Sequence, residues 1–147
     1  MALSEEQRHQ LVAGYLGAAA RDLKAADLIA ESGDTDVAAL AAYHVQQCAE
    51  KLAKALFAAR GYLITKEHRL DINLRVVASE PLAALLASFV RYDKFATTTR
   101  YPSTSGKLAA GPTPDELDED IEKLRALLAR AREELGVPVS AVPVPTR

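Results

Sequence analysis

The stretch AAYHVQQCAEKLAKALFAAR, at residues 41–60, decides the fold because it has the pattern of one buried helix. Apolar residues recur along it at spacings of three and four, as on the inward face of a helix. A single polar stripe interrupts them, and it consists of Gln47, Glu50, Lys51 and Lys54. The stretch therefore predicts a central helix against which the other elements pack.

Capping signals predict where further helices begin. Ser4 with Gln7, and Thr113 with Glu116, have the capping-box pattern that marks a helix N-terminus. Acidic residues up to Asp120 crowd the first turns of the last helix, where the helix dipole favours negative charge. Helices are predicted over about residues 5–31, 35–60, 70–78, 81–96 and 114–135. The predicted fold is all-α, an up-and-down antiparallel helical bundle of four long helices plus one short helix.

The length of 147 residues suits one domain, which we place at residues 1–136. Residues 137–147, VPVSAVPVPTR, contain three prolines and predict an extended tail. The single cysteine, Cys48, excludes an internal disulfide, and no pair of His or Cys residues has the spacing of a metal site. The N-terminus is polar and acidic, and no apolar run approaches the roughly 18 residues of a membrane span. We expect a cytoplasmic protein without membrane contact, metal or cofactor.

The charge is unevenly distributed along the chain. The net charge of −2 argues against a general nucleic-acid binder. Residues 41–108, however, hold ten Lys or Arg against five Asp or Glu, a local charge of +5, whereas the flanks together carry −7. Since the potential follows local charge, the middle of the chain can form an anion site. The alternative is that the asymmetry vanishes when the blocks mix in the folded state.

A second stretch, TTTRYPSTSG at residues 97–106, carries the candidate site. The planar guanidinium of Arg100 can bind a phosphate through two hydrogen bonds, and Tyr101 can stack on a base. Pro102 favours an extended conformation at the residue before it, which keeps the turn rigid. We expect lysines of the polar stripe to line the adjacent wall. The candidate ligand- or phosphate-binding residues are Arg100, Tyr101, Lys54, Lys51, Gln47 and His68.

Each candidate also has a purely structural interpretation. Arg100 can form a salt bridge with Glu50 or Asp93, while Tyr101 packs into the bundle. His44 lies within the apolar stripe of the central helix, where a histidine is more often hydrogen-bonded to a neighbour than a ligand or a base. No catalytic residue is assigned.

The pattern AAYHVQQCAEKLAKALFAARG, then a basic loop with His68, then TRYPSTSG before an acidic-capped helix, resembles the HEPN domain. RDLKAADLI, at residues 21–29, is similar to the first helix of that family, and the likeness runs from about Arg8 to Leu135. The resemblance implies a bundle of four to five helices that commonly forms a homodimer. It also implies nucleotide or RNA binding, often beside a nucleotidyltransferase-like partner protein in a toxin–antitoxin unit.

The ribonuclease branch of that family carries an arginine followed four to six residues later by a histidine. Such a pair suits metal-independent RNA cleavage, because His can move a proton near neutral pH and Arg can stabilise the charged transition state. Here no histidine follows Arg100; the three histidines are His9, His44 and His68. We therefore expect a non-catalytic nucleotide- or RNA-binding or protein-interaction module. A metal-independent ribonuclease is the alternative, and its Arg–His pair would have to form in three dimensions or across a dimer.

Overall fold

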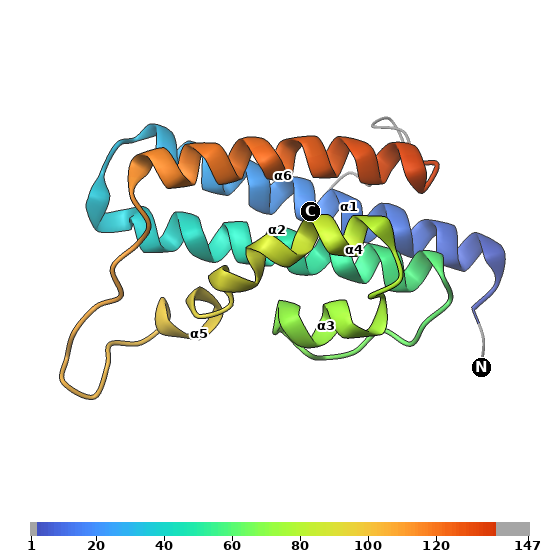
Figure 1. Cartoon of the computed structure of the whole chain (residues 1–147), viewed down its shortest axis with the longest axis horizontal. Coiled ribbons are helices and arrows are strands. Elements are labelled where there is room, and N and C mark those ends of the chain that lie inside the picture. Colours follow the sequence, from blue (N-terminus) through green and yellow to red (C-terminus); the bar gives the residue numbers. More distant parts are fainter. Residues whose placement is uncertain (1–2, 138–147) are drawn as a thin grey trace, which may run out of the picture.

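The computed structural model describes residues 3–137, and every regular element in this part of the chain is a helix (Figure 1). The α-helices are α1 (Glu5–Glu31), α2 (Ala38–Ala59), α3 (Leu70–Val76), α4 (Pro81–Leu86), α5 (Phe95–Thr98) and α6 (Pro114–Glu134). Two 3₁₀ segments, η1 (Thr35–Val37) and η2 (Ala87–Tyr92), precede α2 and follow α4. Apart from its first residue, the predicted proline-rich tail lies outside the described residues.

The helices form an antiparallel bundle with α2 at its centre. In Figure 1, α2 runs opposite to α1, the series α4–η2–α5 returns beside α2, and α6 completes the bundle. Sixteen of the 22 residues of α2 are buried, which explains why its sequence is apolar on nearly every side. The predicted all-α class is therefore confirmed.

Local sequence signals account for the C-terminal end of α2 and for the two predicted N-caps. Both capping boxes, at Ser4 and Thr113, are present. At the end of α2, Gly61 adopts a φ of 72°, a left-handed conformation that glycine accepts without steric cost. The backbone N–H of Tyr62 donates to the carbonyl of Phe57 at 2.9 Å, and the two rings meet edge to face. This is the Schellman motif, which satisfies carbonyl groups that the helix end leaves open.

The single helix predicted over residues 81–96 is wrong, because the segment is divided into α4, η2 and α5. Leu86, Phe89, Tyr92 and Phe95 are all buried and follow one another at intervals of three residues. A 3₁₀-helix has three residues per turn and keeps such a series on one side. An α-helix would turn Phe95 to the side opposite Leu86, since nine residues make two and a half turns. Burial of these four side chains therefore favours the 3₁₀ geometry.

Asp120 of α6 holds this segment in place. Its carboxylate is 2% exposed and accepts hydrogen bonds from the Tyr92 hydroxyl and, at 2.6 Å, from the Arg91 guanidinium. The sequence explained Asp120 only by its position near the helix dipole, and that explanation leaves out these two hydrogen bonds. Asp120 ties α6 to the residues that directly precede Asp93 and Lys94, two residues of the site described below.

The loop between α5 and α6 is anchored rather than loosely extended. A Cβ atom added at Gly111 would lie 2.5 Å from backbone atoms of Ala38 and Ala39, so only glycine allows the loop to approach α2 this closely. At the tip, the N–H of Ser103 donates to the carbonyl of Lys107 at 2.8 Å. These contacts give the loop a defined shape next to α5.

Candidate functional site

A groove of about 780 Å³ lies between the loop after α2 and the segment of α5. Five basic side chains and two carboxylates are among its lining groups. We call it the basic groove, and its residues are Gln47, Lys66, Glu67, His68, Arg69, Asp93, Lys94, Ala96, Thr97 and Arg100. Its charge therefore comes from the part of the sequence with the local excess of Lys and Arg.

The carboxylate of Asp93 is already occupied by protein donors. It accepts hydrogen bonds from Gln46 Nε2 at 3.0 Å and from the backbone N–H groups of Leu70 at 2.8 Å and Asp71 at 3.1 Å. Asp93 thus caps the N-terminus of α3 from another part of the chain. Arg69 pairs at 2.7 Å with Asp71, outside the groove lining.

Three cations of the basic groove keep their charge available. Glu67 accepts hydrogen bonds from the two backbone N–H groups that follow it, at 3.0 and 2.9 Å. Among residues 3–137, no carboxylate oxygen lies within 4.0 Å of the charged nitrogens of Lys66, Lys94 or Arg100. The groove therefore presents positive charge that carboxylates do not neutralise directly.

His68 is held at one ring nitrogen by a buried carboxylate. Glu50 of α2 is 2% exposed, and its Oε1 lies 3.1 Å from His68 Nδ1 and 2.8 Å from Lys54 Nζ. Its other oxygen accepts from Gln47 Nε2 at 3.1 Å. A carboxylate can only accept, so Nδ1 carries the proton and Nε2 of the neutral ring is the acceptor. With the His68 side chain 72% exposed, its ring is both oriented and accessible.

Arg100 rests on Tyr43 of α2. Its Nη2 donates to the Tyr43 hydroxyl at 3.2 Å, and the guanidinium carbon lies 5.8 Å from the ring centre. This contact replaces the alternative salt bridge to Glu50 or Asp93. Tyr101 is 74% exposed, so it does not pack into the bundle as the structural alternative required.

Lys51 and Lys54 do not line the basic groove, contrary to the expectation from the polar stripe. Lys54 is 6% exposed and its charge is paired with Glu50 inside the bundle. Lys51 binds Asp22 of α1, which also lies 2.9 Å from Nδ1 of His44. Burial alone would raise the pKa of Asp22, but the hydrogen bonds from His44 and Lys51 outweigh it and lower that pKa. Both lysines therefore serve helix packing, as does His44.

The structure brings Gln47, His68 and Arg100 together in the basic groove, although they come from three parts of the chain. It adds Lys66 and Lys94, which sequence reasoning did not select. The local excess of positive charge was the only signal for these two lysines. The pattern of α2 could not show which of its polar residues faces the groove, because that depends on the segments packed against it.

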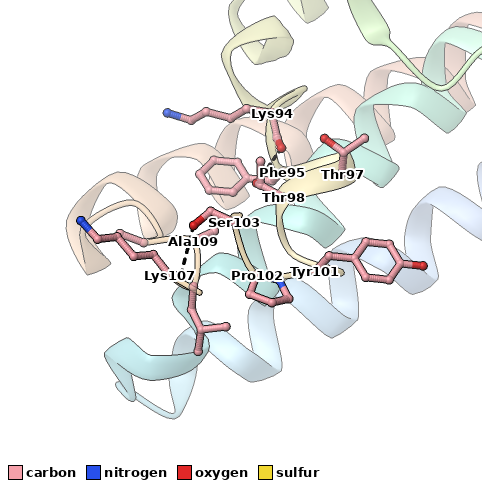
Figure 2. Close-up of a pocket in the computed structure, with 11 residues that line it drawn as sticks. Lys94, Phe95, Thr97, Thr98, Tyr101, Pro102, Ser103, Lys107 and Ala109 are labelled. Carbon is pink, nitrogen blue, oxygen red and sulfur yellow. Dashed lines mark hydrogen bonds between the residues drawn. The ribbon is translucent and has the colours of Figure 1, made fainter. Parts of the chain in front are cut away.

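A second cavity, of about 540 Å³, lies between α5 and the loop that follows it (Figure 2). We call it the apolar pocket, because hydrophobic groups make up most of its wall. Lys94 and Thr97 line both cavities. Its residues are Lys94, Phe95, Thr97, Thr98, Tyr101, Pro102, Ser103, Lys107, Leu108, Ala109 and Ala110. The predicted residue Tyr101 thus belongs to this pocket and not to the basic groove.

Across residues 3–137, the His, Cys, Asp and Glu side chains form no group of three that suits a metal ion. None of the helices described in this range is long and apolar enough to span a membrane.

Comparisons with known proteins agree with the geometry of the bundle. The model of the HEPN domain family matches residues 12–135. A solved structure, described as that of an archaeal HEPN homologue, is similar with a TM-score of 0.57 and 24% sequence identity. The similarity covers 82% of this chain and 94% of the archaeal chain, and at that identity it concerns the fold alone. A search of curated proteins found no match.

Proposed function

The chain belongs to the HEPN domain family, and we propose that it is a binding module that holds the phosphates of a nucleotide or RNA in the basic groove. The observation that carries this proposal is that three cations, Lys66, Lys94 and Arg100, line one groove. The carboxylates of the same groove accept hydrogen bonds from backbone N–H groups and do not pair with these cations. The net charge of −2 does not oppose it, because the local potential decides where an anion binds.

Arg100 is the main phosphate ligand in this proposal. A guanidinium has five N–H donors, and the contact with Tyr43 uses one of them. The others can bind two phosphate oxygens, which is the geometry that arginine provides and lysine does not. Gln47 and His68 line the same groove, where Gln47 Oε1 and Nε2 of the neutral His68 ring can accept hydrogen bonds from ribose hydroxyls.

Binding of a fluorescently labelled single-stranded RNA, measured by anisotropy at low salt, tests the proposal. Arg100→Ala is expected to weaken binding roughly tenfold or more, since a hydrogen-bonded charge is lost. Lys123→Ala is the matched control, because Lys123 is an exposed cation of α6 with only a surface salt bridge. Equal binding by wild type and Arg100→Ala, or no binding by either, would refute the role of the groove.

A second candidate function is metal-independent RNA cleavage, and the position of His68 favours it. His68 and Arg100 line the same groove although the usual order and spacing of the pair are absent. Nε2 of His68 can accept the proton of a 2′-hydroxyl, whose oxygen then attacks the adjacent phosphorus and displaces the 5′-oxygen of the next nucleotide. That oxygen takes a proton from water and leaves as a hydroxyl. Arg100 would stabilise the negative charge that develops on the phosphate.

Cleavage of a labelled RNA, followed by gel electrophoresis, distinguishes this candidate from binding alone. If His68 acts as the base, His68→Ala should lower the cleavage rate by about 10²-fold or more while RNA binding falls much less. Wild-type cleavage no faster than a buffer blank would remove the ribonuclease and leave the binding module.

Further properties that the family resemblance implies are part of the same proposal. They are a homodimer, a nucleotidyltransferase-like partner protein within a toxin–antitoxin unit, and a cytoplasmic location. The exposed loop between α5 and α6 is available for a protein contact, since Tyr101 and Leu108 are 74% and 84% exposed.

A further inference from the structure

The basic groove and the apolar pocket adjoin across α5, and they differ sharply in chemistry. Lys94 and Thr97 line both, so a bound chain can pass from one to the other without leaving the protein surface. Their volumes, about 780 and 540 Å³, each fall in the range of small-molecule sites. The two cavities together are therefore suited to a ligand with repeating charged and flat apolar parts.

We propose that the two cavities are adjoining subsites for one single-stranded oligonucleotide of at least two nucleotides. This inference rests on the proposed function, because it takes the basic groove as the phosphate subsite. The apolar pocket then receives the base of the neighbouring nucleotide. A mononucleotide brings one base and one phosphate, so it makes fewer contacts with the two cavities than an oligonucleotide does.

The wall of the apolar pocket offers surfaces on which a base can stack. Pro102 forms part of the wall and Leu108 is 84% exposed at its edge, whereas Phe95 is only 5% exposed and supports the wall from inside the bundle. The Tyr101 ring projects from the loop and does not fold back over the pocket (Figure 2). Contact of bases with such groups tolerates any sequence, because every base has a flat π-face.

Lysine side chains lie on both sides of this apolar wall. Lys94 lies between the pocket and the basic groove, and Lys107 lies in the loop on the far side (Figure 2). No carboxylate is paired with Lys107 among residues 3–137. Basic groups that alternate with apolar surface are typical of grooves that hold single-stranded nucleic acid.

The pocket is formed before any ligand binds. The N–H of Ser103 donates to the Lys107 carbonyl at 2.8 Å, and the N–H of Lys107 donates to Ser103 Oγ at 3.1 Å. Further along, Gly111 packs directly on the backbone of Ala38 at the start of α2. A loop held in this way loses little conformational entropy on binding, which leaves more of the stacking energy for affinity.

The experiment compares the affinities of AMP and of the dinucleotide pApA for the intact chain by competition against a labelled RNA. We expect pApA to bind roughly tenfold more tightly than AMP, because a second base stacks in the apolar pocket. Leu108→Ser should reduce the ratio of the two affinities towards one. Leu63→Ser is the matched control, since Leu63 is 88% exposed and lines neither cavity, and it should keep the wild-type ratio.

The outcomes separate this inference from the proposed function. Measurable but equal binding of AMP and pApA would overturn the second subsite and leave the phosphate site intact. An unchanged ratio in Leu108→Ser would also overturn it. Absence of binding by both nucleotides and by the labelled RNA would refute the proposed function itself.

Discussion

Replacing Glu50 with alanine is expected to lower the free energy of unfolding by about 3–5 kcal/mol. Glu50 is 2% exposed and pairs with Lys54, which is itself 6% exposed. Removal of the carboxylate leaves the Lys54 ammonium without a partner inside the bundle, where an isolated charge is costly. Urea denaturation followed by the circular dichroism of the helices measures the loss.

A double variant separates the unpaired charge from simple loss of packing. Glu50→Ala combined with Lys54→Met removes both charges and keeps an apolar chain of similar length, so it should be clearly more stable than Glu50→Ala alone. Lys123→Met is the control, because Lys123 is an exposed cation with only a surface salt bridge, and it should change the stability by less than about 1 kcal/mol. A loss below about 1 kcal/mol in Glu50→Ala, or a double variant as unstable as the single, would contradict this account.

Asp120→Ala is the second substitution for which we expect a large effect, a loss of about 2–4 kcal/mol in the free energy of unfolding. The Tyr92 side chain is 1% exposed and its hydroxyl donates to Asp120. Without that acceptor the hydroxyl is buried and unsatisfied, whereas Arg91, which is half exposed, can turn to water. Burial is the main cause that raises the pKa of Tyr92, and the hydrogen bond and charge of Asp120 raise it further. The phenol therefore keeps its proton and donates it in the hydrogen bond to Asp120.

Thermal or urea unfolding of matched variants tests the second prediction. Asp120→Ala with Tyr92→Phe removes both partners and should recover part of the stability, since no orphaned hydroxyl remains. Asp118→Ala, at an exposed acidic position of the same helix, should change the stability by no more than about 0.5 kcal/mol. Equal losses in the Asp118 and Asp120 variants would show that Asp120 acts only through the helix dipole.

These two carboxylates also position the basic groove. Glu50 orients His68, and Asp120 holds the segment that leads into Asp93 and Lys94. Neither role could be predicted from the sequence. An acidic residue in a helix pattern is equally compatible with a solvated surface, a dipole contact or a buried hydrogen bond, and only the packing partner distinguishes them.

The prediction of the fold succeeded where the determinants are local. Ser4 and Thr113 cap their helices with side-chain oxygens a few residues from the amides they bind, and Gly61 ends α2 through its own backbone conformation. The helix predicted over residues 81–96 failed because its geometry depends on what buries Phe89 and Tyr92. The sequence shows the interval of three residues between these apolar side chains, but it does not show that all of them are buried.

By itself, the sequence determined an all-α chain, a buried helix at residues 41–60 and a positive charge concentrated in the middle of the chain. These properties follow from periodicity, capping and composition. The tertiary structure alone decided that Lys54 turns inward to Glu50 while Gln47 reaches the groove beside Arg100. The physical reason is that periodicity assigns residues to faces of a helix, whereas the loops and helices packed against each face determine which polar groups are buried in pairs and which meet solvent.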